Sequence, residues 1–248
     1  MFYTNLQKLF AELIAKHNLA DQAVEINARI LSNEEAIGNP SRDDYPLLKG
    51  KEFLMEARCM DMVGQAYTDA PSCLTTNLAQ ISHTALDTTE QRALFISTLN
   101  AVVRAIEPQL KTIHCHNDEP ERCAEQMMNA IAILKPQKIG LVGLQPAILE
   151  ALVKRWGAQA VQCLDRDNSM RGTSKYGVPI LWGDSAETQA VFRASDLILA
   201  TGSTIVNGSL PGLLELAEQT HTPIYFYGTS IAGAAKILHL NHLCYEAA

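Results

Sequence analysis

The chain has 248 residues, 47% of them hydrophobic and 19% charged, with a net charge of −7. This composition indicates a globular protein, and at about 100 to 200 residues per domain the length allows two modest domains. The negative charge disfavours binding to nucleic acid or an anionic membrane. No apolar run approaches the roughly 18 residues of a membrane span, and the first residues lack a signal-peptide pattern. We therefore expect a cytoplasmic protein.

The six cysteines are scattered along the chain, at positions 59, 73, 115, 123, 163 and 244. Their low density does not fit a disulfide scaffold, so reduced thiols are the expected state. Any chemistry that involves sulfur would then use thiols or a bound metal.

Residues 1–110 predict a small α+β lobe. Apolar residues recur at helical spacing from Leu6 to Ile14 and predict an amphipathic opening helix, while 52–72 contains short alternating stretches typical of paired strands. Thr88 and Gln91 form a capping-box pattern before a further helix, which should end before Pro108.

Residues 111–248 predict a Rossmann-like open parallel sheet. After a short polar segment, a helix is expected to begin at Pro120 with Asn117 or Asp118 as its cap. Five strands, at 138–143, 160–165, 178–182, 196–202 and 223–228, then alternate with helices. The first of these helices should begin at Pro146 and end at Gly157.

Loops at the carboxyl ends of these strands should share one ligand-binding crevice. The first loop, GLVGLQP (140–146), has neither the G-x-G-x-x-G spacing nor a P-loop lysine, which disfavours a standard dinucleotide or nucleoside triphosphate site. The candidate ligand-binding residues in these loops are Gly143, Gln145, Asp165, Thr201, Gly202, Ser203, Thr204, Asn207 and Thr229.

Two of these loops have alternative interpretations. Asp165 could accept hydrogen bonds from ribose hydroxyls, or it could cap the following turn. The loop ATGSTIVNG (200–208) combines hydroxyls, an amide and glycines suited to an oxyanion or polar ligand. Alternatively, Ser203 and Thr204 cap the helix that follows.

The segment TIHCHNDEPERC (112–123) is rich in possible metal ligands. The candidates are His114, Cys115, His116, Asp118 and Glu119. Cys123 falls on the apolar stripe of the next helix and is interpreted as a packing residue. In a short strand, alternation would place both histidines on the face opposite Cys115.

Three further candidate ligands, His239, His242 and Cys244, lie near the last residues and are equally consistent with a surface helix turn. No Gly-x-Ser-x-Gly or H-E-x-x-H motif is present, so no sequence motif supports a hydrolase.

Taken together, several stretches resemble the heavy-metal chelation family, a family of unknown function that joins an enolase N-terminal-like lobe to a Rossmann-like lobe. The matching stretches are NPSRDDYPLLKGKE (39–52), GQAYTDAPS (64–72), TLNAVVR (98–104), HCHNDEPERCA (114–124), GLVGLQPAILEAL (140–152), ATGSTIVNG (200–208) and FYGTSIAGAA (226–235). The resemblance implies a cleft site between the lobes and a role in handling metals, metal chelates or metallocofactors. It points to the HCHNDEP, DRDN and TGST stretches, and Asp43 and Asp44 could reach the same cleft or be structural.

The resulting hypothesis is a protein that binds a transition metal, or an anionic metal chelate, between its two lobes. The alternative is an enzyme that acts on a nucleotide-like or carboxylated small molecule at the Rossmann crevice. A third hypothesis is a structural or partner-binding module. A homodimer is expected only from the general frequency of symmetric dimers.

Overall fold

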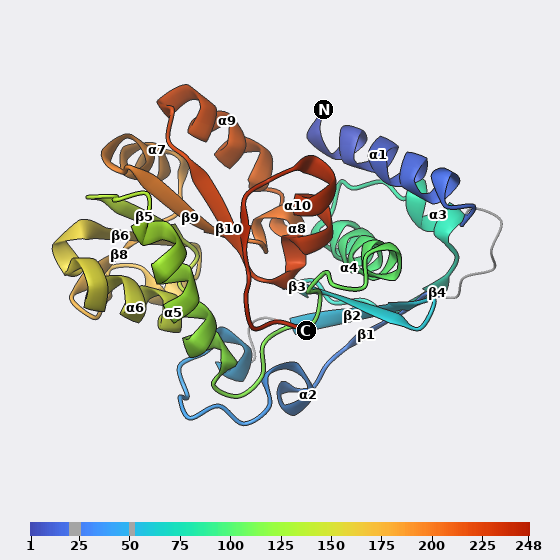
Figure 1. Cartoon of the computed structure of the whole chain (residues 1–248), viewed down its shortest axis with the longest axis horizontal. Helices are drawn as coiled ribbons and strands as arrows, with labels where there is room; N and C mark the ends of the chain where they lie inside the picture. Colours follow the sequence, from blue (N-terminus) through green and yellow to red (C-terminus); the bar gives the residue numbers. More distant parts are fainter. Residues whose placement is uncertain (20–25, 50–52) are drawn as a thin grey trace.

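The computed structural model describes residues 1–19, 26–49 and 53–248. Figure 1 shows two lobes side by side. In the first lobe, strands pair antiparallel in the order β3-β2-β1-β4. They are β1 (Ile26–Ile30), β2 (Phe53–Cys59), β3 (Met62–Thr68) and β4 (Leu74–Thr76). The predicted small α+β lobe is confirmed at this level.

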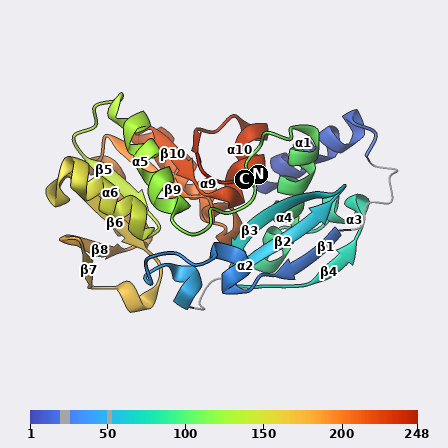
Figure 2. The same cartoon turned by 60° about the horizontal axis from the view of Figure 1, so that its bottom comes forward.

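In the described residues, the first lobe contains the two helices that its sequence predicts and three further helical segments. They are α1 (Phe2–Lys16), α2 (Asn33–Ile37), η1 (Pro46–Lys49), α3 (Leu78–Ser82) and α4 (Thr89–Ile106). The predicted capping box is present, because Thr88 and Gln91 exchange hydrogen bonds at the start of α4. Phe10 of α1 and Phe95 of α4 are fully buried and pack edge to face, with ring centroids 5.1 Å apart. Helices α1 and α4 therefore bury the core on one side of the antiparallel sheet (Figure 2).

The second lobe is built on a seven-stranded sheet in the order β11-β10-β9-β5-β6-β8-β7. Its strands are β5 (Ile139–Val142), β6 (Val161–Asp165), β7 (Ser174–Lys175), β8 (Val178–Trp182), β9 (Leu197–Thr201), β10 (Ile224–Tyr227) and β11 (His242–Leu243). All neighbours are parallel except β7, which is antiparallel to β8. The five predicted strands and their parallel arrangement are confirmed.

Helices cover both faces of this sheet. They are α5 (Glu119–Ala132), α6 (Pro146–Trp156), η2 (Ala158–Ala160), η3 (Asn168–Met170), α7 (Ser185–Ala194), α8 (Thr204–Asn207), α9 (Leu210–Thr220), η4 (Thr229–Ile231) and α10 (Ala232–Leu238). Figure 1 shows α5 and α6 on one face and α7 and α9 on the other. The strands are buried on both sides as a result, which explains their nearly continuous apolar sequences.

One local expectation is corrected, and the strand alternation considered for residues 114–116 does not apply. Helix α5 begins at Glu119, one residue before the predicted Pro120, and the side chain of Asp118 makes no cap bond. Residues 111–118 form no strand. The backbone N–H of His114 donates to the side chain of Gln65, and that of Asn117 donates to the carbonyl of Ile37, so neither takes part in a sheet ladder.

The strand order creates a crevice at the carboxyl ends of β5 and β9. From β5 the chain moves to β6 and β8 on one side, then returns to β9 and β10 on the other. Connections leave β5 and β9 in opposite directions, and ligands of doubly wound folds bind at such a point.

The two lobes share a core. Leu99 of α4, Ile205 of α8 and Ala234 of α10 are fully buried in one cluster, together with residues of α1 and β9. The predicted domain boundary after residue 110 lies in the loop that follows α4 and stays a prediction. Within the three described ranges, no helix has the length and apolarity needed to cross a membrane.

Candidate functional site in the cleft between the lobes

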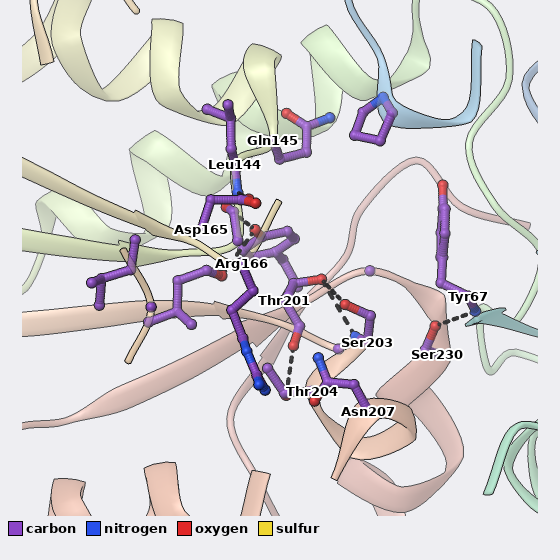
Figure 3. Close-up of a pocket in the computed structure, with 18 of the residues that line it drawn as sticks. Tyr67, Leu144, Gln145, Asp165, Arg166, Thr201, Ser203, Thr204, Asn207 and Ser230 are labelled. Carbon is purple, nitrogen blue, oxygen red and sulfur yellow. Dashed lines mark hydrogen bonds between the residues drawn. The ribbon is translucent and has the colours of Figure 1, made fainter. Parts of the chain in front are cut away.

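A cleft of about 1210 Å³ runs from the strand-end crevice to the first lobe. All nine residues predicted to bind a ligand line it. Figure 3 shows the crevice, with the loops after β5, β6 and β9 converging on it and Ser230 and Tyr67 at its far side. The backbone N–H of Tyr67 donates to Ser230 Oγ at 2.9 Å, so both lobes contribute to the wall.

The loop after β9 holds its hydroxyls in an internal network. Thr201 Oγ1 and Ser203 Oγ lie 3.1 Å apart, and the hydroxyl of Thr204 donates to the carbonyl of Thr201 at 2.7 Å. Ser203 stands at the N-cap of α8 but makes no side-chain cap bond, and Thr204 is buried. Thr204 is thus used in the loop itself, whereas Thr201 and Ser203 present a pair of hydroxyls along the cleft.

Asp165 ties two loops together. One of its carboxylate oxygens accepts from the backbone N–H of Leu144 at 2.6 Å, and the other accepts from that of Asp167 at 2.7 Å. Each oxygen already has a strong partner, so the loop-capping interpretation describes its contacts, while ribose binding stays a prediction.

Glycine is required at position 143. Gly143 has φ +89°, and a Cβ there would lie 2.6 Å from Cγ2 of Thr201. The loops after β5 and β9 therefore approach each other closely. Gln145 caps α6 through a 2.7 Å bond from the N–H of Ile148.

The remaining predicted ligand-binding residues have local contacts. The N–H of Gly202 donates to the carbonyl of Tyr227 at 2.7 Å, and Asn207 Oδ1 accepts from Ser209. Thr229 is buried, and its hydroxyl has no hydrogen-bond partner among the residues described.

Cys115, Cys123 and Cys244 form a cluster at the edge of the cleft, which we call the three-thiol cluster. Their sulfur atoms all lie within 4.8 Å of one another. Cys115 and Cys123 are buried and Cys244 is partly buried, and all three line the cleft. The cluster could hold a metal ion, because three thiolates are a soft donor set.

Hydrogen bonding separates the acidities of these thiols. Hydrogen bonds with the sulfur of Cys115, and then with that of Cys244, lower the pKa of Cys123. The backbone N–H of Tyr245 also donates to Cys123 Sγ at 3.3 Å. The pKa of Cys115 is raised, first by its hydrogen bond to Cys123 and then by that to Cys244. Cys123 is therefore the most acidic of the three thiols.

Cys115 alone of the five predicted metal ligands lies in this cluster. His114 also lines the cleft, but its Nδ1 lies 3.1 Å from the carbonyl oxygen of Ala36, and burial lowers the pKa of its ring to about 4. The backbone N–H of His116 donates to Glu119 at 2.7 Å, and its Nε2 is buried without a partner in the described ranges. Asp118 accepts from the N–H of Ser41.

The sequence predicts a packing role for Cys123, and it leaves Cys244 open between a metal ligand and a surface helix turn. Cys123 does face the interior, but its neighbours there include two other sulfurs. Cys244 is brought in by the last residues, where Ala248 donates to the carbonyl of Ile113 at 3.1 Å and Arg122 pairs with Glu246 at 3.0 Å. His239 is exposed and lines neither this cleft nor the smaller pocket beside it.

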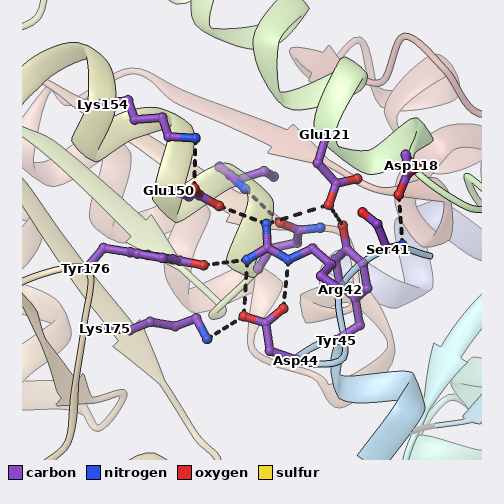
Figure 4. Close-up of polar contacts among 12 residues, drawn as sticks. Ser41, Arg42, Asp44, Tyr45, Asp118, Glu121, Glu150, Lys154, Lys175 and Tyr176 are labelled. Carbon is purple, nitrogen blue, oxygen red and sulfur yellow. Dashed lines mark hydrogen bonds and ion pairs between the residues drawn. The ribbon is translucent and has the colours of Figure 1, made fainter.

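A clamp of charged residues fixes a first-lobe loop against the second lobe (Figure 4). The guanidinium of Arg42 donates to Asp44 at 2.7 Å and to Glu150 of α6 at 2.9 Å. Asp44 lines the cleft and also pairs with Lys175 at 2.5 Å, whereas Asp43 is exposed and outside it. The loop therefore forms one wall of the cleft.

A family model matches part of the second lobe. The sequence model of the DUF364 family, described as "Putative heavy-metal chelation", matches residues 126–239. Over these residues the chain is similar to DUF364, in agreement with the resemblance seen in its sequence. The three-thiol cluster lies outside the matched residues. A search of curated proteins finds no match.

Two solved structures share the fold. One is a protein of unknown function from the DUF364 family of Pyrococcus horikoshii, with a TM-score of 0.57 and 13% identity over 93% of this chain and 82% of that one. The other is a DUF364 protein of unknown function from Desulfitobacterium hafniense, with a TM-score of 0.51 and 14% identity over 96% of this chain and 84% of that one.

Proposed function

We propose that this protein binds a soft or borderline transition-metal ion through Cys115, Cys123 and Cys244. The observation that carries the proposal is the mutual distance of the three sulfur atoms, all within 4.8 Å. Bonds of about 2.3 Å to one tetrahedral zinc ion place two thiolate sulfurs roughly 3.8 Å apart. Small side-chain rotations would bring the sulfur atoms from their present separation to the distance that the ion requires. The description of the family, heavy-metal chelation, agrees with this chemistry.

We further propose that the ion is bound together with an anionic organic ligand, as a metal chelate in the cleft. Three thiolates leave a four-coordinate ion one position for a further ligand. The cleft, of about 1210 Å³, has room for an organic molecule beside the cluster. The hydroxyl pair of Thr201 and Ser203 would donate one hydrogen bond to its oxygens, because the other hydroxyl proton joins the pair.

The same crevice supports the second candidate, an enzyme that acts on a carboxylated or nucleotide-like small molecule. The hydroxyl pair of Thr201 and Ser203 favours this candidate, because it lies at the carboxyl ends of β5 and β9, where doubly wound folds bind ligands. Asp165 adds little to it, since both of its oxygens accept bonds from backbone N–H groups.

Calorimetric titration with Cd²⁺ tests the metal proposal. The reduced protein should bind one ion per chain, and Cys123→Ser should weaken binding by more than about a hundredfold, since outer-shell changes alone cost 10- to 100-fold. Cys73→Ser is the matched control, because Cys73 is exposed and outside the cluster. Equal affinities for the wild type and Cys123→Ser would refute direct binding by the three-thiol cluster.

A further inference from the structure

A second, smaller pocket meets the three-thiol cluster from another side. It has a volume of about 240 Å³ and lies between the loop after α4, helix α10 and strand β11. Its lining residues are Glu107, Gln109, Leu110, Lys111, Lys236, His242 and Cys244. Cys244 also lines the large cleft, so this residue borders both cavities. Figure 1 shows the last residues of the chain running between the lobes beside α10.

His242 provides a nitrogen ligand in this pocket. Its Nε2 lies 2.9 Å from the carbonyl oxygen of Gly228. A carbonyl only accepts, so Nε2 must carry the proton, and the neutral ring keeps a lone pair on Nδ1. The structure gives Nδ1 no hydrogen bond to any residue it describes. A backbone hydrogen bond of this kind is the usual way in which a metal-binding histidine is oriented.

The positive charges of the pocket are already engaged. The ammonium of Lys236 pairs with the carboxylate of Glu107 at 2.8 Å, and that of Lys111 donates to the carbonyl of Tyr245. Neither lysine therefore uses its ammonium group to bind His242 or Cys244. A nitrogen and a thiol two residues apart thus remain as the metal-binding groups of the pocket.

We propose that this pocket is a second metal site, at which His242 Nδ1 and Cys244 Sγ take up a soft or borderline ion before it passes to the three-thiol cluster. The inference rests on the proposed function, since it assigns the route by which the cluster is filled. Cys244 belongs to both sets of ligands, so the ion moves by exchanging His242 for Cys115 and Cys123 without leaving that sulfur. The thiol proton of Cys244 goes to solvent when the ion first binds, and any proton held by Cys115 or Cys123 goes to solvent when these sulfurs replace His242.

Uptake kinetics test the route with the cluster intact. His242→Gln keeps an N–H donor near the carbonyl of Gly228 but removes the Nδ1 ligand. We expect the same final stoichiometry of Cd²⁺, with an uptake rate about tenfold lower, the lower limit for loss of a metal-supporting contact. His239→Gln, which changes an exposed histidine outside both cavities, should leave the rate unchanged. An unchanged rate in His242→Gln would overturn the proposal.

A second measurement detects the site itself. In the double variant Cys115→Ser, Cys123→Ser the cluster is dismantled, and Cd²⁺ should still bind weakly and shift the Nδ1 resonance of His242 in ¹⁵N spectra. Adding His242→Gln should abolish this weak binding, and adding His239→Gln should not. If the double variant does not bind Cd²⁺, or binds it equally well with and without His242, the second site is refuted. Either result leaves the proposal for the three-thiol cluster intact. Failure of the wild type to bind Cd²⁺ would refute both proposals.

Discussion

Asn100, in the middle of α4, accepts a 2.7 Å hydrogen bond at Oδ1 from the backbone N–H of Gly233 at the start of α10. Its Nδ2 donates to the carbonyls of Gln65 in β3, at 2.8 Å, and of Thr229 and Ser230, both at 3.1 Å. The side chain is fully buried. One amide therefore joins the first-lobe sheet to the loop after β10 that lines the cleft.

Replacing Asn100 with Asp should destabilise the protein strongly. A carboxylate oxygen would face the three carbonyl oxygens that the amide now serves, a buried charge without a partner. The free energy of unfolding measured with urea should fall by about 3 to 5 kcal/mol. Asn129→Asp is the control, because Asn129 is on the surface of α5 and accepts a bond from Arg155. Equal losses for the two variants would show that Asn100 does not couple the lobes.

Arg42→Ala should loosen the clamp between the lobes. Only 16% of the Arg42 side chain is exposed, and its removal leaves Asp44 and Glu150 with fewer cationic partners. We expect a loss of about 2 kcal/mol in unfolding free energy, between the values for exposed and buried ion pairs. Lys154→Ala removes an exposed partner of Glu150 and should change stability little. A similarly small loss of unfolding free energy for both variants would contradict a stabilising role for the clamp.

The clamp also predicts a pH dependence. Burial raises the pKa of the Asp44 carboxyl, but hydrogen bonds from Arg42 and Lys175 outweigh burial and lower it to about 2. An unfolded Asp titrates near 3.9. The contribution of Asp44 is therefore complete above about pH 4 and is lost as the pH falls towards 2. The stability difference between the wild type and Asp44→Asn should shrink over that range, and a constant difference would be inconsistent with a lowered pKa.

Metal binding should release about two protons per ion at neutral pH. Hydrogen bonds from Cys115 and Cys244 lower the pKa of Cys123, so one ligand is already a thiolate, and the other two must lose protons to bind. Affinity for Cd²⁺ should accordingly rise with pH. Calorimetry in two buffers of different ionisation enthalpy counts the protons. A count of three would show that Cys123 is protonated in the free protein.

The fold of the second lobe was predictable because its signals are local. Each of its five longer strands is an apolar run followed by turn residues, and Pro146 and Gly157 mark the ends of α6. Strands β7 and β11 were missed because two residues carry no periodic pattern. The segment 111–118 is predicted only as a short polar segment, and its backbone donors bond to side chains and to distant carbonyls, which no local pattern indicates.

The three-thiol cluster could not be predicted as a set. Motif rules depend on ligands that are close in sequence, such as C-x-x-C, whereas Cys244 lies at the other end of the second lobe. Cys123 shares its helical stripe with Met127, and this apolar pattern is the same whether the thiol packs against carbon or sulfur. The density of histidines and cysteines around Cys115 was the available signal, and it identified only Cys115 among the three cysteines of the cluster.

X-ray absorption at the zinc edge of the Zn²⁺-loaded protein tests the metal proposal most directly, because it counts the atoms bound to the ion. The account predicts three sulfur neighbours at about 2.3 Å in the wild type, and two in Cys244→Ser. A shell of nitrogen and oxygen atoms alone, unchanged by that substitution, would contradict binding by the three-thiol cluster.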